Sequence, residues 1–493
     1  MAPKSSTERD AAASTPTNDS RFTRRQFLLS VGATLAGLAL GSRGWNMLGE
    51  LVALTRLPPS PHSAPNVLLI ILDTVRAPSL SLHGYERRTT PNLERLAKAG
   101  MLFERAVATD SWTLPSHVSM FTGRYPHELS ADRKTPLDFT YPTLAEVLSA
   151  RGYLTAGFVA NLEYCTSESG LGRGFAHYDD YDVSPGDFIL AWSLGNYLSQ
   201  RPRIRQLVDN WNSLDRKSAS QVNSEFLEWL DHKGSRPFFA FLNYFDAHAP
   251  YYPPEPFDTM FGPTTPRDGP VSEKWLHKKD IPTDVLQAEI NAYDSTIAYL
   301  DHEVGLLLDE LGKRGVLENT VVIVTADHGE EFGEHDVFGH GQSLYLPSLH
   351  VPLMILYPGR VPAGKSVAEV VSLRDMVATV MDLANLASES AFPGKSLARY
   401  WKNPPGAHDP TSAVAFSELK FAGAFPQWFP IAKGNIQSLV ANGYHYIKNG
   451  DGREELYDWL VDPWEQRDLS GTEGGRKEMA QFRIQLESIA SDG

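Results

Sequence analysis

Asn66-Val-Leu-Leu-Ile-Ile-Leu-Asp73 is a run of apolar residues that ends in a carboxylate. A continuous apolar run of this length predicts a central strand that is buried on both faces of a sheet. Such a strand delivers Asp73 to the carboxyl edge of the sheet, where open α/β sheets bind their ligands. An aspartate after a strand also commonly caps a turn or a helix, so Asp73 alone does not decide between the two roles.

A second strand is expected over Thr320-Val-Val-Ile-Val-Thr325, which is rich in β-branched residues. It runs into Asp327-His328-Gly329-Glu330, which places oxygen and nitrogen ligands side by side, and Gly329 permits a tight turn. The ends of two such strands meet at one edge of a sheet. We therefore expect Asp73 to lie close to this segment.

Thr113-Leu-Pro-Ser-His117 predicts the start of a helix, because proline suits a first turn in which no backbone donor is needed. The free N–H groups of that turn attract an anion. A hydroxyl is a poor nucleophile at neutral pH unless a base or a metal ion removes its proton. We therefore predict that Thr113 is a metal-bound alkoxide nucleophile. The site would hold one divalent ion, with the ligands Asp73, Thr113, Asp327 and His328.

The chain resembles the sulfatase branch of the alkaline phosphatase superfamily over nearly everything from Asn66 to Asp468. The matching stretches, in order, are Leu72-Asp73-Thr-Val-Arg76, Thr90-Pro-Asn-Leu93, Trp112-Thr-Leu-Pro-Ser-His117, Thr122-Gly123, Pro237-Phe-Phe-Ala-Phe-Leu242 with His248-Ala-Pro250, Tyr293-Asp294, Asp327-His-Gly-Glu330, Glu334-His335 with Gly339-His-Gly341, Val351-Pro352, and Glu455-Leu-Tyr-Asp458 with Asp462-Pro463. The resemblance implies an α/β fold, namely an alkaline-phosphatase-like large mixed sheet flanked by helices, with a small C-terminal antiparallel sheet subdomain. It also implies a divalent metal ion and cleavage of sulfate or phosphate esters.

Several positions depart from the family pattern. Similar sulfatases carry Cys-x-Pro-Ser-Arg or Ser-x-Pro-Ser-Arg, whose first residue becomes formylglycine, whereas this chain has Thr113 and His117 at the two ends of that motif. Threonine cannot become formylglycine, and the single cysteine, Cys165, lies far away in the sequence, so we expect no formylglycine. The family's Asp-Asp pair is Asp73-Thr74 here, and its Gly-Lys-Trp-His-Leu-Gly segment is replaced by Gly157-Phe-Val-Ala-Asn-Leu162. These departures make the chain closer to phosphate-transferring relatives, including the lipoteichoic-acid synthase group and other phosphodiesterases.

Two histidines are predicted to act on the transferring group. Imidazole titrates near neutral pH, so His248 and His340 are candidates for stabilising that group and protonating the leaving oxygen. His340 falls where similar sulfatases place a substrate-binding lysine, and His248 follows an apolar strand as their strand-end histidine does. Each could instead be an ordinary histidine of a surface loop. The predicted substrate-binding residues are Arg76, His117 and His335, with Asp246 in reserve.

The metal ion is expected to be manganese, zinc or calcium. His328 stands where calcium-using sulfatases commonly have asparagine, which favours manganese or zinc. The primary hypothesis is an exported metal-dependent hydrolase acting on a small-molecule or envelope-linked anionic ester. One alternative is a phosphoryl-group transferase or phosphodiesterase with a cell-envelope substrate. The other is a catalytically silent, substrate-binding relative.

Composition limits the class of protein further. A chain of 493 residues with 42% hydrophobic residues can bury a substantial core, and one large domain with a small one fits this length. A formal net charge of −15 argues against nucleic acid as the main partner. One cysteine permits no internal disulfide, so cysteine usage does not indicate the compartment.

The N-terminal region, residues 1–64, is predicted to be a twin-arginine signal or anchor followed by a linker. Arg24-Arg25-Gln-Phe-Leu-Leu29 precedes an apolar run to about Leu40. This implies the twin-arginine export machinery as a partner and a periplasmic or extracellular location. No small-x-small cleavage site follows the run, so the segment is also a candidate membrane tether. At about 15 residues it is shorter than the roughly 20 that a spanning helix needs.

The remaining segments are predicted to form a catalytic domain over 65–400 and a small α+β subdomain over 401–493. Helical spacing is expected over 91–100 and 282–315, and antiparallel strands over 413–418, 437–448 and 455–459, followed by a helix over 477–489. Between 184 and 233 lies a polar insertion with four aromatic residues, Trp192, Tyr197, Trp211 and Trp229. We expect this insertion to cover the sheet.

Overall fold

The computed structural model describes Glu50 and residues 54–61, 63–180, 216–264, 277–387, 392–402 and 413–491. The predicted twin-arginine segment around Arg24 and Arg25 lies outside these residues, as do Trp192, Tyr197 and Trp211 of the insertion. Within the described residues, every helix is either too short or too polar to cross a bilayer.

An eight-stranded mixed sheet forms the centre of the molecule, in the order β10-β2-β9-β6-β1-β5-β3-β4. β1 pairs in parallel with β5 and β6, and β9 runs antiparallel to β2 and β6. The large mixed sheet predicted from the sequence is therefore confirmed. The strands are β1 (Asn66–Leu72), β2 (Met101–Val107), β3 (Leu154–Val159), β4 (His177–Asp179), β5 (Phe238–Tyr244), β6 (Thr320–Thr325), β9 (His350–Leu356) and β10 (Lys365–Ser372).

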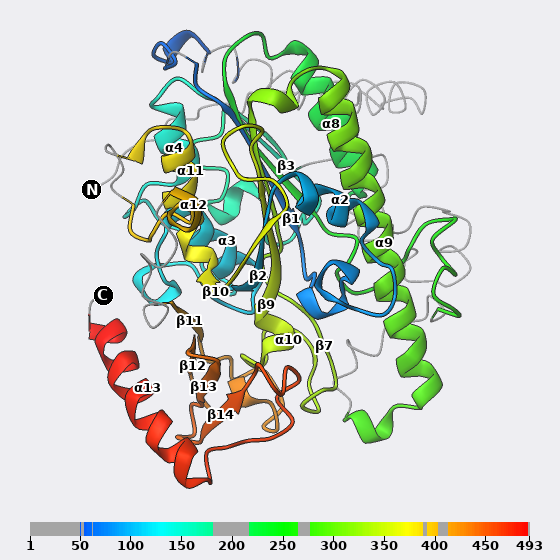
Figure 1. Ribbon diagram of the computed structural model, residues 1–493, viewed down its shortest axis with the longest axis vertical. Helices are drawn as coiled ribbons and strands as arrows, with labels where there is room; N and C mark the ends of the chain where they lie inside the picture. The colour runs from blue at the N-terminus through cyan, green and yellow to red at the C-terminus, as the bar shows by residue number, and fades with distance from the viewer. Residues whose placement is uncertain are drawn as a thin grey trace, which may run out of the picture.

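Helices cover both faces of this sheet. Figure 1 shows α3, α4, α11 and α12 on one side and α2, α8 and α9 on the other. The long α9 contacts α2 and α8, and α3 contacts α4 and α11, so each layer is packed laterally as well as onto the sheet. The bounds are α2 (Pro91–Ala99), α3 (Thr113–Thr122), α4 (Leu144–Ser149), α8 (Ala219–His232), α9 (Thr283–Lys313), α10 (Leu346–Leu349), α11 (Met376–Leu383) and α12 (Arg399–Lys402).

A four-stranded antiparallel sheet follows near the C-terminus, in the order β11-β12-β13-β14. Its strands are β11 (Val414–Leu419), β12 (Ile436–Ala441), β13 (Tyr444–Lys448) and β14 (Glu454–Asp458), and α13 (Glu473–Ser491) packs against it. The stretch 437–448 thus contains two strands. Asn442 and Gly443 have φ values of 53° and 83°, which are the positive values that a two-residue hairpin turn requires.

The arrangement of the central strands positions the chemistry. β1 ends at Leu72 opposite Tyr244 of β5, and Ile71 lies opposite Thr325 of β6. Because these neighbours are parallel, the residues that follow them leave the sheet at the same edge. β1 is buried from Val67 to Leu72, so its continuous apolar run is explained by burial on both faces. A short hairpin of β7 (Glu331–Phe332) and β8 (Phe338–Gly339) extends from the β6 end.

Candidate active site

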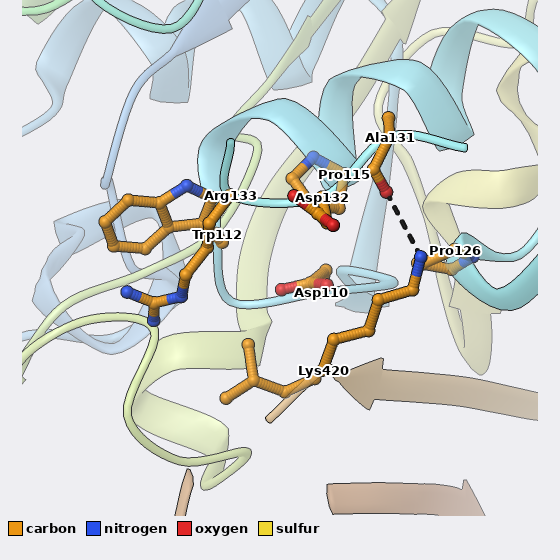
Figure 2. Close-up of a pocket in the computed structure, with 9 residues that line it drawn as sticks. Asp110, Trp112, Pro115, Pro126, Ala131, Asp132, Arg133 and Lys420 are labelled. Carbon is orange, nitrogen blue, oxygen red and sulfur yellow. Dashed lines mark hydrogen bonds between the residues drawn. The ribbon is translucent and has the colours of Figure 1, made fainter. Parts of the chain in front are cut away.

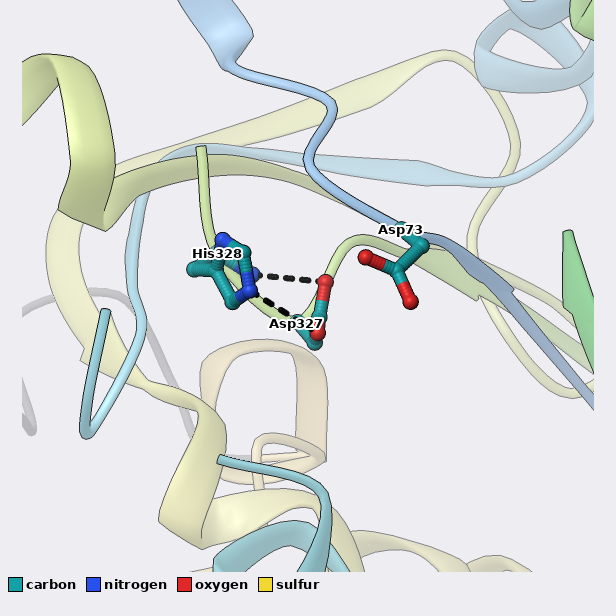
Figure 3. Close-up of side chains that lie close together, drawn as sticks. All are labelled: Asp73, Asp327 and His328. Atoms are coloured by element: carbon teal, nitrogen blue, oxygen red, sulfur yellow. Dashed lines mark hydrogen bonds and ion pairs between the residues drawn. The ribbon is translucent and has the colours of Figure 1, made fainter. Parts of the chain in front are cut away.

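Asp73, Asp327 and His328 meet at the carboxyl edge of the sheet (Figure 3). One ligand atom from each residue lies within 4.8 Å of the other two, and all three side chains are fully buried. Asp73 follows β1, and the other two follow β6. The two strand ends predicted from the sequence therefore do come together.

The carboxylate of Asp73 is held by two amides. Asn161 Nδ2 donates to Asp73 Oδ2 at 3.0 Å, and Asn243 Nδ2 donates to the same oxygen at 3.3 Å. The other oxygen, Oδ1, is buried and has no hydrogen-bond partner in the described part of the chain. An anionic oxygen in that position is costly unless a cation is nearby.

The carboxylate of Asp327 shows the same pattern. Its Oδ1 accepts hydrogen bonds from the backbone N–H groups of Thr74 at 3.2 Å and of His328 at 2.9 Å. Its Oδ2 has no hydrogen-bond partner among the described residues. Thr74, where the family has a second aspartate, thus orients Asp327 through its backbone. Asp327 Oδ2 lies 3.3 Å from His328 Nε2, and this pair together with Asp73 Oδ1 fits a divalent ion such as manganese or zinc.

The electrostatics of the cluster agree with that interpretation. Burial, together with the nearby Asp327 charge, raises the pKa of Asp73 to about 8. Burial also raises the pKa of Asp327 to about 7 and lowers the pKa of His328. Without a metal ion, the protein therefore favours the protonated forms of Asp73 and Asp327. A bound divalent ion would favour the charged carboxylates and reverse these pKa shifts.

Thr113 is the first residue of α3 and is almost fully buried. Its Oγ1 lies 3.3 Å from His328 Nε2, so the threonine hydroxyl adjoins the cluster. Ser116 Oγ donates to the Asp327 carbonyl oxygen at 2.6 Å, which fixes the first turn of α3 against the end of β6. The start of a helix favours an anion, because its first N–H groups have no partner within the helix.

Gly329 has a different role from the predicted one. Its φ lies outside the left-handed region, so the turn does not require glycine for its backbone angles. A Cβ at this position would lie 2.1 Å from the carbonyl oxygen of Pro347 and 2.9 Å from Arg76 Cβ. Glycine is therefore required because the backbone of another segment approaches closely.

His117 lies beneath the cluster and does not face open space. Its Nδ1 is 2.8 Å from the Thr113 carbonyl oxygen and 3.5 Å from Asp327 Oδ2. Its Nε2 is 3.8 Å from Cys165 Sγ, so the cysteine that is remote in sequence adjoins the motif in space. Burial lowers the pKa of His117 to about 4, which keeps the ring neutral. These contacts favour a supporting role over the predicted contact with substrate.

His248 and His340 do adjoin the cluster. The His340 ring lies 4.5 Å from the ring of His328 and 4.9 Å from that of His248, measured between centroids. His340 Nδ1 is 3.0 Å from Glu330 Oε1, and Tyr251 Oη donates to Glu330 Oε2 at 2.8 Å. This chain of contacts fixes the His340 ring and leaves its Nε2 for a ligand. Burial lowers the pKa of both histidines.

Three other predicted residues have contacts of a different kind. The Arg76 guanidinium pairs with Glu334 at 2.6 Å and donates to the Glu330 carbonyl oxygen at 3.0 Å, so its donors serve the β7 region. The His335 ring stacks on Tyr345 with centroids 3.6 Å apart, beneath the C-terminal sheet. Asp246 accepts a hydrogen bond at 3.0 Å from the backbone N–H at residue 219, where α8 begins. These contacts favour a structural role over substrate binding for all three residues.

Sequence reasoning missed four residues that shape the site. Asn243 is the second-to-last residue of β5 and lies one position beyond the quoted apolar stretch, so the strand-end rule that selected Asp73 extends to it. Asn161 lies inside the segment that replaces the family's lysine and histidine. The sequence showed the replacement of those two residues but gave no role to Asn161. Glu330 belongs to the quoted motif but was given no role. Tyr251 carried no signal, because it acts through Glu330.

The comparisons with known proteins agree with this geometry. The family profile described as Sulfatase matches residues 65–386, and the profile of the N-sulphoglucosamine sulphohydrolase C-terminal region matches residues 333–492. An ulvan-active sulfatase of Formosa agariphila is 25% identical over 420 residues, covering 83% of this chain and 77% of that protein. Arylsulfatase K of Bos taurus is 26% identical over 450 residues, covering 83% and 78%.

Solved structures show the same fold. The phosphonate monoester hydrolase of Agrobacterium radiobacter superposes with a TM-score of 0.68 at 23% identity, over 87% of this chain and 96% of that one. A protein in complex with its substrate D-glucosamine-2-N,6-O-disulfate gives a TM-score of 0.66 at 18% identity, over 87% and 99%. The expected alkaline-phosphatase-like fold is confirmed, and the chain belongs to the sulfatase family.

Proposed function

We propose that this sulfatase-family hydrolase cleaves sulfate esters with Thr113 as its nucleophile and without formylglycine. The observation that supports this most directly is the position of Thr113 Oγ1, 3.3 Å from His328 in the cluster with Asp73 and Asp327. The matching relatives are sulfatases, which supports sulfate as the transferred group. A divalent ion held by the three cluster residues would lower the pKa of the Thr113 hydroxyl.

The reaction then has two displacements. The Thr113 hydroxyl passes its proton to the neutral imidazole of His340 or His248, its oxygen attacks sulfur, an O–S bond forms, and the bond from sulfur to the alcohol oxygen breaks. The departing oxygen takes that proton back from the imidazolium, which restores the uncharged ring that the lowered pKa of His340 and His248 favours. Water next attacks the sulfur of the threonine ester, releasing sulfate and restoring the hydroxyl. The N-terminus of α3 stabilises the added negative charge in both steps.

The charged groups around the site favour a substrate ester that carries a single negative charge. The two cluster carboxylates balance a divalent ion, the charge of Arg133 acts on His328 and His340, and the charge of Arg216 acts on His248. Arg76 is already paired with Glu334. Because Asp110 acts on Arg133 and Arg76 is paired, little positive charge beyond a divalent ion faces the ester, which suits a sulfate monoester better than a phosphate monoester that is doubly charged at neutral pH.

A second candidate substrate class has a specific observation in its favour. A threonine ester cannot be opened by the elimination that a formylglycine hydrate allows, so the second step needs direct attack on the central atom. Phosphorus tolerates such attack well. Phosphonate monoesters and phosphate diesters also carry one charge, and the fold resembles that of a phosphonate monoester hydrolase. Transfer to a cell-envelope hydroxyl would be the corresponding transferase activity.

We also propose that the first 64 residues direct export by the twin-arginine route and leave a periplasmic or extracellular enzyme, with a tether if the segment is retained. The twin-arginine pattern at Arg24 and Arg25 supports this. The proposed division places the catalytic domain at 65–400 and the subdomain at 401–493. The four-stranded sheet of β11 to β14 supports that second unit.

The test is a paired assay of purified protein with 4-nitrophenyl sulfate, phosphate monoester, phosphate diester and phosphonate monoester, each with manganese, zinc or calcium. We expect hydrolysis of sulfate above the dianionic phosphate monoester, and loss of activity in Thr113→Ala. Thr122→Ala is the matched control, because Thr122 is a buried threonine at the other end of α3. A fully active Thr113→Ala protein would refute the nucleophile assignment. Protein that takes up no divalent metal would favour the silent relative.

A further inference from the structure

Basic residues collect at the amino edge of the central sheet, opposite the candidate active site. Of its eight strands only β9 is antiparallel to the rest, so the segments that enter the other seven lie at one edge. With the last turn of each preceding α-helix, these segments comprise the described residues of 50–65 and residues 96–100, 146–153, 170–176, 229–237, 310–319 and 357–365. They contain ten lysine or arginine residues and five aspartate or glutamate residues, in a chain whose formal net charge is −15.

The positive charge of this edge is exposed. Three of the five acidic residues are held in ion pairs, in which Glu146 pairs with Arg173 and both Asp231 and Glu310 pair with Arg314. Four of the basic residues are exposed and form no ion pair with another residue in the described part of the chain. These four are Arg56, Lys98, Arg360 and Lys365.

Hydrogen bonds join the entering segments into one continuous rim. The Gly364 N–H donates to the Gly100 carbonyl oxygen at 2.9 Å, which joins the entries of β10 and β2. Asn319 Nδ2 donates to the Ala64 carbonyl oxygen at 3.2 Å, which joins the entries of β6 and β1. Arg236 donates to carbonyl oxygens of the segments that enter β1, at 2.8 Å, and β3, at 3.2 Å. Because neighbouring strands lie about 4.8 Å apart, this rim is roughly 30 Å wide.

The described chain also begins at this rim, at the upper end of the molecule in Figure 1. Trp229 Nε1 donates to Glu50 Oε1 at 3.2 Å, and Leu54 and Leu57 pack against the core. The apolar run of the predicted N-terminal signal or anchor ends at about Leu40, roughly ten residues before Glu50. Ten residues reach at most about 36 Å. A retained N-terminal segment therefore brings this rim to the membrane.

We propose that the basic rim is a docking surface for an anionic lipid bilayer, and that the active site lies on the side facing away from the membrane. Lysine and arginine side chains are attracted to the negative potential of such a bilayer. Asp73 lies at the far end of β1, and seven residues of a strand span about 23 Å. The ester then reaches the site from the aqueous side.

The charges near the active site do not compete for the bilayer. Figure 2 shows two acidic residues, Asp110 and Asp132, with two basic ones, Arg133 and Lys420, around a small pocket beside α3. The formal charges there balance, whereas those of the rim do not. The inference goes beyond ester hydrolysis and uses the proposed export only as the source of a membrane.

The first test measures partition of the full-length protein onto sedimented vesicles of phosphatidylcholine, alone or mixed with phosphatidylglycerol. The wild type should prefer the mixed vesicles. The triple variant Lys98→Glu, Arg360→Glu, Lys365→Glu should lose that preference by about a hundredfold, because each basic residue near an anionic bilayer contributes about fivefold. The control triple variant has Lys134→Glu, Arg467→Glu and Lys477→Glu, which reverse three exposed residues outside the rim. The N-terminal segment is the same in all three proteins.

The second test measures orientation. The native Cys165 is buried, so one introduced cysteine can be labelled selectively. A fluorophore on Ala363→Cys in the rim should transfer more energy to labelled lipid in the mixed vesicles than one on Gln481→Cys of α13, which Figure 1 shows at the other end of the molecule.

Several results would overturn the proposal. They are equal partition onto both kinds of vesicle, equal losses in the two triple variants, transfer from position 481 that equals or exceeds that from position 363, and binding to duplex DNA that is tighter than binding to mixed vesicles at the same salt concentration. Neither measurement uses turnover. A protein that docks by its rim and hydrolyses no ester would therefore refute the proposed function and leave the docking surface established.

Discussion

Asn161 offers a sharp test of the metal site, because its side chain acts on a proposed ligand without being one. Asn161→Ala removes the donor that lies 3.0 Å from Asp73 Oδ2. That hydrogen bond keeps the carboxylate turned so that Oδ1 faces the cluster. We expect the apparent affinity for manganese or zinc to fall while the ligands themselves stay in place.

The size of the effect follows from the contact. A buried hydrogen bond to a charged group contributes about 1.5–3 kcal/mol, which corresponds to roughly tenfold to a hundredfold in affinity. Asn243 still donates to the same oxygen at 3.3 Å, so the lower part of this range is expected. Loss of an outer partner of a metal ligand typically costs about 10–100-fold, in agreement. Asn243→Ala, which removes the longer bond, should cost less.

The assay is isothermal titration of metal-free protein with manganese or zinc, in competition with a chelator of known affinity. Asn435→Ala is the control, because Asn435 is exposed and accepts only from the Phe421 backbone in the small domain. Circular dichroism of the metal-free variant separates a folding defect from a loss of binding. An unchanged affinity in correctly folded Asn161→Ala protein would refute the view that this amide orients a metal ligand.

Three further predictions follow from particular contacts. Glu330→Gln weakens the contact between Glu330 Oε1 and His340 Nδ1. The hydrolysis rate should therefore fall more for alkyl sulfates, whose leaving oxygen needs a proton, than for 4-nitrophenyl sulfate. An equal fall for both substrates would contradict the positioning role of Glu330. Gly329→Ala places a Cβ 2.1 Å from a carbonyl oxygen and should lower stability by about 1–3 kcal/mol in thermal unfolding, whereas Gly471→Ala, with nothing within 4 Å, should be neutral. Because the pKa of Asp73 is raised from 3.8 to about 8, the metal-free folded state holds a proton that the unfolded chain releases. Its stability should therefore fall as pH rises from about 4 to 8, by up to about 1.4 kcal/mol per pH unit. Bound manganese should remove that slope, and a flat profile in chelator would contradict the raised pKa.

The sequence predicted correctly those elements whose local residue pattern also indicates their place in the fold. The apolar run of β1 determined both its burial and the edge to which it delivers Asp73, and the β-branched run of β6 did the same for Asp327. Parallel pairing of these strands then makes their ends neighbours without further information. The first residue of α3 was also predictable, because proline in the first turn favours a helix start at Thr113.

The side chains that sequence could not place are those whose partners lie on remote loops. Arg76 was predicted to bind an anionic substrate, but its guanidinium forms an ion pair with Glu334 on the β7 hairpin. His335 was predicted to bind substrate, but its ring stacks on Tyr345. Cys165 appeared remote and lies 3.8 Å from His117. None of these contacts leaves a periodic pattern or a fixed spacing in the sequence, so only the folded structure reveals them.

His117 shows how the departures from the family pattern act together. In similar sulfatases the motif ends in arginine, whereas here a neutral imidazole occupies that position and lies against Thr113, Asp327 and Cys165. Burial holds the pKa of His117 near 4, so the ring does not supply the missing charge at neutral pH. The site must then stabilise the transferring group with the metal charge, the N-terminus of α3 and Arg133. That set suits one negative charge on the ester, so we expect sulfate monoesters, phosphonate monoesters and phosphate diesters to be hydrolysed in preference to phosphate monoesters.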